Sequence, residues 1–353
     1  MWWFLLLKLV AAEPENDMTP EPSSEVIGED EDAPVPSDES EQPLSEEQRQ
    51  ENLRQLWSSM SDEDLTEQVF ARQSSGKYDS AQEILDFLVD RNDVPYYSFL
   101  WAQNHEFMEL YPVALAEYED LLSLDLLPDL ELNVRFRKAI VLDDMGFSRE
   151  AVTAFRRLRR GKKLLGEGDL EKVNLLLGAA LIHSGKHRCG TRLINKILPL
   201  VEADAAWYQA RARHALIDVL IHSAEKKVIR GGAKTKLLVA SRLQIMSAAE
   251  QQLGAIVQLY ESEFILSGII SIVDAYLRFY DDVVTVPPPQ EYTFQRAKIY
   301  ELALLEKAEV IRRKALSFSS KGVNYAKRVG WDGEALQELT ARRDALQKAI
   351  QQR

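Results

Sequence analysis

The stretch Gly76-Lys77-Tyr78-Asp79-Ser80-Ala81 decides the fold, because its pattern returns three times further along the chain. A glycine that ends one helix is followed by a small residue in the next, and Leu85 and Leu88 continue on a helical spacing. A small residue lets a neighbouring helix approach closely, and the bulky residues after it fill the seam between the two helices. The stretch therefore predicts two helices joined by a tight turn.

Four copies of this pattern follow one another. Their small residues are Ala81, Ala114, Ala151 and Gly190, at spacings of 33, 37 and 39 residues. The bulky residues four and seven positions later are Leu85, Leu88, Tyr118, Leu121, Phe155, Leu158, Ile194 and Ile197. The copy around Ala114 lacks the glycine of the turn. The units resemble the tetratricopeptide repeat (TPR), which has a period of about 34 residues. The resemblance implies an all-α, right-handed helical-repeat solenoid.

We expect four degenerate TPR-like helix pairs over residues 52–204, and a C-terminal helical region over residues 205–353 that continues the solenoid. Apolar residues at helical spacing and breaks at glycine and proline predict the helices of this second region. They are one helix from about Trp207 to before Gly231, a pair between Leu237 and Val283 that is split near residues 261–267, one long helix from Tyr292 to about Lys327, and a capping helix over residues 332–353 with Asp332 as its N-cap.

Residues 1–12 are typical of the end of a secretory signal peptide. An apolar run from Trp2 to Val10, interrupted by Lys8, precedes Ala11-Ala12, so small residues stand before a cleavage point at Glu13. This predicts an exported, periplasmic protein without a transmembrane span in the mature chain. The run is short and lacks a basic start, which fits a truncated signal; a hydrophobic tail or anchor is the alternative.

Residues 13–51 contain fifteen acidic residues and one base, Arg49. Such a segment has too little apolar surface to fold, so we expect a disordered acidic tether rich in proline. Of the 56 acids and 43 bases in the chain, 15 acids and two bases lie before residue 52, which leaves 41 of each in the body. A neutral body argues against nucleic acid as a partner.

The sequence predicts no enzyme, cofactor or metal site. Cys189 is the only cysteine, which excludes an intramolecular disulfide. His183 and His187 have the i, i+4 spacing of metal ligands, but a turn signal separates them and no zincin carboxylate follows. The stretch from Gly231 to Thr235 lacks the glycine before lysine that a phosphate loop requires.

The first helix of each TPR unit lines the concave groove, and this phase predicts a partner-binding groove. Aromatic side chains are favoured anchors in such grooves, although each also suits the core between repeats. The candidate residues are Phe70, Tyr96, Phe99, Gln103, Phe107, Phe136, Ile140 and Asp143. Of the positions that clamp a terminal carboxylate in some TPR domains, only Arg137 matches, while Thr66, Phe70, Leu100 and Asn133 do not. The pattern favours a hydrophobic or helical ligand.

A basic run near the end of a predicted helix is the second candidate site. It comprises Arg156, Arg157, Arg159, Arg160, Lys162 and Lys163. Cations at a helix C-terminus complement the helix dipole, which is the simpler explanation. The functional alternative is a patch that binds anions or an acidic partner, including the acidic tether itself.

Residues 235–330 carry a second resemblance. The stretches that support it are Leu237-Leu238 with Ala240, Ala275-Tyr276, Phe279-Tyr280, Pro287 to Pro289, Tyr300-Glu301, Glu306-Lys307-Ala308 and Lys314-Ala315-Leu316. They resemble the C-terminal region of periplasmic TPR proteins of the delta-proteobacterial gliding-motility machinery. The resemblance implies a non-catalytic scaffold that binds protein partners in an envelope complex. The alternative is a cell-wall glycan-acting enzyme, or its activator, with an α-superhelical domain.

Overall fold

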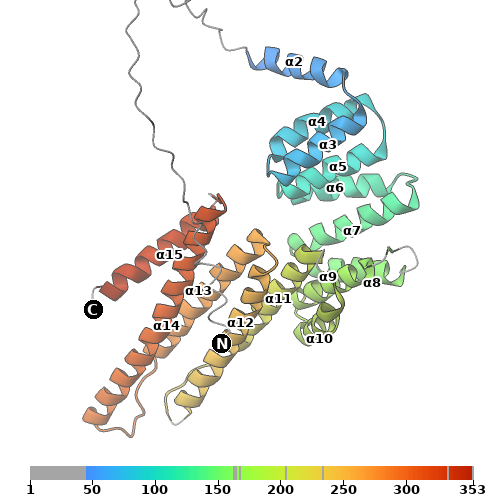
Figure 1. Cartoon of the computed structure of the whole chain (residues 1–353). Coiled ribbons are helices and arrows are strands. Elements are labelled where there is room, and N and C mark those ends of the chain that lie inside the picture. The colour runs from blue at the N-terminus through green and yellow to red at the C-terminus, as the bar shows by residue number, and fades with distance from the viewer. Residues whose placement is uncertain are drawn as a thin grey trace, which may run out of the picture. The chain divides into compact units, whose positions relative to one another are not determined.

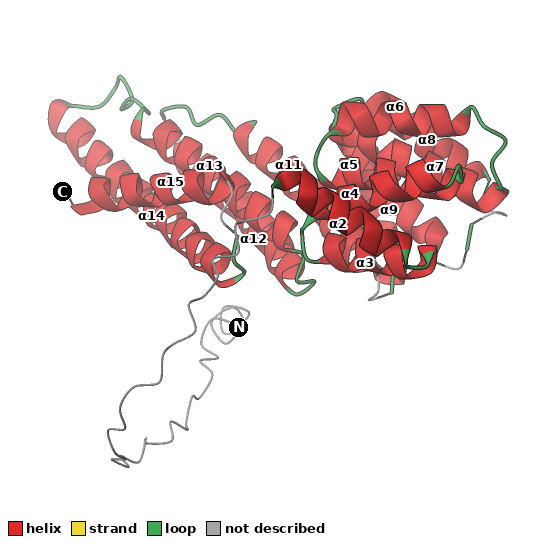
Figure 2. Cartoon of the chain, turned by 90° about the horizontal axis from the view of Figure 1, so that it is seen from above, coloured by secondary structure: helices red, strands yellow, loops and turns green. Residues whose placement is uncertain are grey.

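The computed structural model describes residues 45–161, 165–166, 168–202, 205–232, 234–331 and 334–351. Residues up to Phe70 and residues from Ala71 onward form two separate compact units. The described residues form helices, turns and loops and contain no strand (Figure 2). The prediction of an all-α fold is confirmed.

The first unit contains α2 (Glu46–Ser58) and most of α3 (Asp62–Ser74). Ser45 and Gln48 form a capping box: the Gln48 amide donates to the Ser45 Oγ at 3.3 Å, and the Ser45 amide donates to the Gln48 Oε1 at 3.2 Å. Because this cap starts a helix, residues 46–51 are helical, and the boundary predicted for the tether at residue 51 is wrong. The predicted signal peptide and tether residues 13–44 lie outside the described residues.

The second unit holds the helices that Figure 1 labels from α4 onward. They are α4 (Tyr78–Arg91), α5 (Pro95–Phe107), α6 (Tyr111–Leu122), α7 (Pro128–Asp144), α8 (Ser148–Arg160), α9 (Asp169–His183), α10 (His187–Ile197), the 3₁₀ turn Leu198–Leu200, α11 (Ala206–Glu225), α12 (Thr235–Val257), α13 (Ser262–Val284), α14 (Phe294–Arg328) and α15 (Glu334–Gln351). From α4 to α15 each helix packs on the next. The odd-numbered helices from α5 to α15 also pack on one another in order. They therefore form one layer of the stack.

The turns within the four helix pairs share one backbone geometry. Gly76, Glu109, Gly146 and Gly185 all have a left-handed φ, between 60° and 84°. At Gly76, Glu109 and Gly185 the next amide donates to the carbonyl five residues earlier, at 2.8–2.9 Å, as in a Schellman motif. Glu109 thus occupies the position of the glycine missing from the second copy. The second copy therefore has the same turn geometry as the others, although glutamate replaces the usual glycine.

The predicted seam residues are buried in all four pairs. Ala81, Ala114, Ala151 and Gly190 lie inside, together with the eight bulky residues that follow them. The closest approach joins α9 and α10, where a Cβ on Gly190 would lie 2.5 Å from the Gly178 carbonyl oxygen. Within the second unit, α5 packs on α6, α7 on α8 and α9 on α10, which agrees with the predicted helical repeat.

The C-terminal region has longer helices than the repeats. The predicted break in the Leu237–Val283 stretch falls between α12 and α13, at residues 258–261, and α14 is the single long helix expected. Gly231 is required by packing, since a Cβ there would lie 2.6 Å from the Pro287 carbonyl oxygen. Asp332, the predicted N-cap of the last helix, lies outside the described residues. Among the helices described, none combines the length and apolar character needed to cross a bilayer.

Candidate partner-binding surfaces

Three residues of the predicted groove lie on the accessible side of α5. Tyr96 is 41% exposed and Phe107 is 37% exposed, while Gln103 is half-buried. Phe99, on the same helix, is buried with its ring centroid 6.2 Å from that of Tyr118. Phe70 is exposed and belongs to the other unit. Within the second unit, the part of the predicted groove on α5 therefore reduces to Tyr96, Gln103 and Phe107.

Phe107 lies beside a buried ion pair. Its ring stacks on Tyr78 with centroids 5.8 Å apart, and the Arg137 guanidinium lies 5.2 Å from its centroid. The Arg137 Nε donates to the Glu106 Oε2 at 2.9 Å, and the Tyr118 hydroxyl donates to the same oxygen at 2.9 Å. Burial raises the pKa of Glu106, while Arg137 and Tyr118 oppose the rise. Arg137 is thus committed to an internal carboxylate.

The α7 part of the predicted groove is covered by the protein itself. The Phe136 ring lies 6.1 Å from that of Tyr208 on α11, and Ile140 is buried. Asp143 is buried and accepts a hydrogen bond from Arg211 of α11 at 3.2 Å. Side chains of α11 therefore occupy the face of α7 that was predicted to receive a partner. Phe99, Ile140 and Asp143 do not line an open groove, and the prediction is wrong for these three.

Arg211 organises a charged junction between α7, α9 and α11. It donates to both Asp144 oxygens, at 2.6 and 3.1 Å, as well as to Asp143. His183 Nδ1 lies 3.0 Å from Asp143 Oδ2, the oxygen that Arg211 also binds, and 3.1 Å from Oδ1. Burial favours the neutral carboxyl, but His183 and Arg211 together lower the pKa of Asp143. Burial lowers and Asp143 raises the pKa of His183, and the net effect is a rise.

The sequence reasoning missed this junction. Arg211 stands among the apolar positions of a predicted amphipathic helix, and that misplaced charge was the available signal. His183 is used for the ion pair, whereas the His187 ring lies 5.2 Å from that of His222. The described part of the chain contains no group of three or more His, Cys, Asp or Glu side chains arranged to hold a metal ion.

Four side chains of the predicted basic patch are exposed. Arg156, Arg157, Arg159 and Arg160 are exposed at the end of α8, whereas Lys162 and Lys163 lie outside the described residues. Basic side chains also cover α10, which contains no acidic residue. Within the described residues, the exposed cations of these two helices and the preceding turn make no ion pair; they are Arg149, Arg156, Arg157, Arg159, Arg160, Lys186, Arg188, Arg192 and Lys196. We call these nine side chains the basic face.

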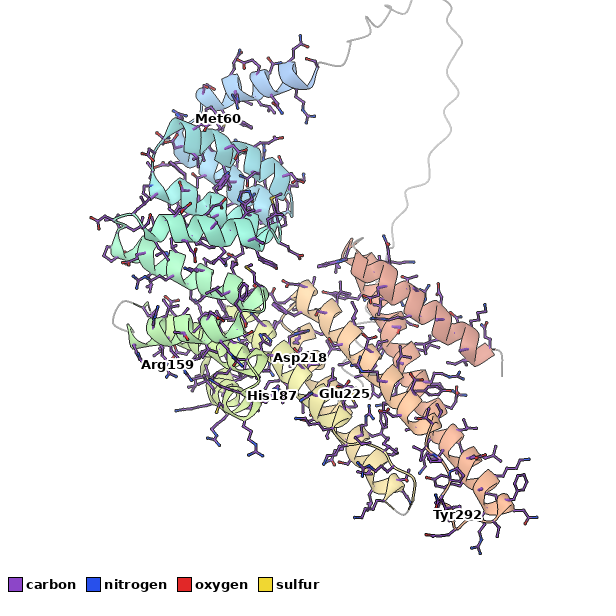
Figure 3. All side chains as sticks on the ribbon, turned by 180° about the vertical axis from the view of Figure 1, so that it is seen from behind. Met60, Arg159, His187, Asp218, Glu225 and Tyr292 are labelled. Carbon is purple, nitrogen blue, oxygen red and sulfur yellow. The ribbon has the colours of Figure 1, made fainter. Side chains whose placement is uncertain are left out.

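The basic face is carried by two helices that both pack on α9. Figure 3 labels Arg159 at the end of α8 and His187 at the start of α10. The helix dipole accounts for the cations in the last turns, which are Arg157, Arg159, Arg160 and Lys196. It does not account for those earlier in each helix, such as Arg149 and Arg188.

A groove of about 660 Å³ runs beside the basic face, between α6, α7 and α8. Its apolar lining residues are Leu122, Leu132, Leu142, Ala154 and Leu158. Charged side chains at its margin are Glu119, Arg135, Lys138, Glu150 and Arg157. We call it the outer groove. Arg157 belongs to both surfaces and joins them.

Comparison with known proteins finds similarity among solved structures. Neither the models of known protein families nor the curated proteins match this chain. Among solved structures, the chain is similar to a tetratricopeptide repeat protein from Parabacteroides merdae, with 12% sequence identity and a TM-score of 0.37. The match covers 80% of this chain and 98% of that one.

Proposed function

We propose that the protein is a non-catalytic helical-repeat adaptor that binds acidic protein partners through its basic face. The observation that supports this most is a set of exposed cations without ion-pair partners. Nine exposed cations on or next to two helices have no ion-pair partner among the described residues, although the body of the chain as a whole carries equal numbers of acids and bases.

A concentration of unpaired cations on two helices that both pack on α9 has a physical consequence for association. The mutual repulsion of these cations is relieved when an acidic surface binds, and the attraction speeds the encounter of the two proteins. The rest of the described body pairs many of its charges, as Arg137 with Glu106 and Arg211 with Asp144 illustrate. Other exposed cations, such as Lys226 and Lys227, also make no ion pair among the described residues, but nine such cations are concentrated in the basic face, which makes it our candidate surface for a partner.

We further propose that the adaptor acts in the bacterial periplasm, as a component of an envelope complex. The signal-like residues 1–12 support export. The resemblance of residues 235–330 to TPR proteins of the gliding-motility machinery favours a complex related to motility or envelope assembly.

Crosslinking in the native envelope, followed by mass spectrometry, tests the proposal. The wild-type chain is compared with a variant carrying Arg188→Glu and Arg192→Glu on α10 and with one carrying Arg156→Glu and Arg160→Glu on α8. We expect the same acidic partner to be recovered with the wild type and lost from both variants. Recovery that is unchanged in both charge-reversed variants, with their helix content intact, would contradict the proposal.

A further inference from the structure

We infer that the outer groove binds an acidic amphipathic segment of a partner protein, with its apolar side chains in the groove and its carboxylates on Arg157 and the adjoining basic face. This inference rests on the proposed adaptor function and names the class of ligand. The apolar lining of the outer groove is mostly leucine, whereas the groove predicted on the first helices of the repeats is lined mainly by aromatic side chains.

The lining of the groove sets the first requirement on the ligand. Four leucines and one alanine come from three different helices, and only Leu158 among the leucines is fully buried. Leu122, Leu132 and Leu142 are half-buried, so part of their surface is still available to a ligand. The volume of about 660 Å³ lies within the range of about 300–1,000 Å³ found for binding pockets. The space suits a few aliphatic side chains projecting from one segment.

The charges at the margin set the second requirement. Lys138 is occupied by Glu119 at 2.9 Å and Arg135 by Glu131 at 2.5 Å. Arg157 makes no ion pair within the described residues, and it stands one helical turn before Gly161, where the groove ends. Beyond it the surface continues into Arg156 and Arg160. Glu150 also lines the groove and makes no ion pair within the described residues, so three basic side chains of the lining stand against two acidic ones. A carboxylate on the ligand would bind the Arg157 guanidinium, since guanidinium groups form strong charge-assisted hydrogen bonds with carboxylates.

The two requirements together select one class of ligand. An amphipathic helix places apolar residues at i, i+3, i+4 and i+7 in a groove, and its flanks can carry acids. A nucleic acid would meet leucines where stacking platforms are needed. An anionic membrane would neutralise the arginines without filling the concave floor. The geometry thus favours an acidic amphipathic segment over either polyanion.

The test uses the full chain and a fluorescein-labelled synthetic peptide with leucine at i, i+3, i+4 and i+7 and glutamate at the flanking positions. Two control peptides have the same leucines with lysine in place of glutamate, or the same composition with the leucines scrambled. Fluorescence anisotropy at low salt should show binding of the first peptide, and at least about ten-fold weaker binding of each control. Equal binding of the scrambled peptide, or no binding of the first peptide, would overturn the inference.

Variants of the chain locate the site. Arg157→Glu removes the cation at the groove margin, and Thr153→Glu, at an exposed position in the lining, introduces an acid. Ala154→Gln fills the groove with a good helix former. Each should weaken peptide binding about ten-fold or more, whereas Lys236→Glu, at an exposed position on α12 outside the basic face, should change it by less than about two-fold. Circular dichroism and a melting curve confirm that each variant is folded.

The outcomes separate this inference from the adaptor proposal. If Ala154→Gln and Thr153→Glu leave binding unchanged while Arg188→Glu weakens it, the basic face binds acidic partners and the groove assignment is overturned. The groove assignment is also overturned if duplex DNA or vesicles of phosphatidylglycerol compete with the peptide equally well in the wild type and in Ala154→Gln. If the crosslinked partner is unaffected by any charge reversal, the adaptor proposal itself fails.

Discussion

The repeats over residues 71–202 and the C-terminal region over residues 205–351 bury their apolar side chains in different ways. The repeats use small cores, including one of eleven and one of eight buried residues that also recruit α11. The C-terminal region is organised around one core of 26 buried residues, which draws on every helix from α11 to α15. In the repeats, stability comes from contacts between neighbours, as in repeat proteins generally. In the C-terminal region it comes from one shared interior.

The two regions also differ in how they bury charge. In the repeats, Glu106 is buried and its partner Arg137 is 16% exposed. In the C-terminal region, Arg242 is only 1% exposed, yet its partner Asp282 is about half exposed. Loss of Arg137 therefore leaves the Glu106 carboxylate buried, whereas loss of Arg242 leaves the Asp282 carboxylate in water.

The largest effect is expected for Arg137→Met compared with Arg242→Met. Removal of Arg137 leaves the Glu106 carboxylate buried without its counter-charge, which costs about 3–5 kcal/mol of stability. Removal of Arg242 leaves Asp282 in water. The Arg242 guanidinium lies 4.5 Å from the centroid of the Phe279 ring, and methionine can also pack on that ring, so we expect a loss of about 1 kcal/mol or less. Hydrogen exchange of the surrounding helices, α5–α7 for the first variant and α12–α13 for the second, measures each loss locally. Equal losses would remove the contrast.

The pH dependence of the Arg137→Met variant gives an independent check. Burial raises the pKa of Glu106 in the folded wild type, so the folded state binds its proton more tightly than the unfolded state. A raised carboxyl pKa means that stability falls as pH rises through the window above about 4.5. Without Arg137 the pKa of Glu106 rises further, so stability continues to fall up to a higher pH. The destabilisation caused by the substitution should therefore shrink between pH 7 and pH 5, and the double variant with Glu106→Gln should show no such recovery.

The second effect concerns two glycines within helices. In the repeats, a Cβ on Gly190 would lie 2.5 Å from a backbone oxygen of α9, so Gly190→Ala forces the helices apart and should cost about 2–3 kcal/mol. In the C-terminal region, Gly254 lies on α12 with no other atom within 4 Å of an added Cβ. Gly254→Ala should stabilise the chain by up to about 1 kcal/mol through helix propensity. Denaturation curves of both variants give the comparison, and a neutral Gly190→Ala would show that the seam tolerates a wider spacing.

These contrasts show what the sequence could predict. The repeat positions could be predicted because each repeat is marked by residues close together in the sequence. These are a glycine in the turn, then a small residue, then bulky residues at helical spacing. The candidate groove was harder to predict from the sequence. Arg211 and Asp144 lie 67 residues apart, and no local pattern indicates that α11 covers α7. The outer groove combines side chains of three helices and likewise has no local signature. The basic run on α8 was visible, because surface charge needs no partner to be recognised.

The third effect concerns the turn residue itself. Glu109 has a φ of 60°, a conformation that costs an L-residue with a Cβ about 1 kcal/mol relative to glycine. Glu109→Gly should therefore stabilise the chain by about 1 kcal/mol, and Gly146→Ala at the equivalent turn should destabilise it by a similar amount. Tyr260, also at a φ of 60° between α12 and α13, supplies the matched position in the C-terminal region. If Tyr260→Gly stabilises and Glu109→Gly does not, the repeat turn is held by side-chain contacts of Glu109.

The smallest effect is the pH response of the junction at His183. Asp143 raises the pKa of His183 above 6.5 in the folded state, so its contribution to stability is fully present below pH 6.5 and is lost as pH rises through the folded pKa. His183→Gln should therefore lower the melting temperature more at pH 6 than at pH 8.5, by an amount equivalent to less than about 1 kcal/mol for this partly exposed pair. His187→Gln is the control, because burial and His222 lower the pKa of His187 and its contribution has the opposite slope. A pH-independent difference for His183→Gln would mean that the imidazole stays neutral beside Asp143, and Arg211 alone would then balance the two carboxylates of the junction.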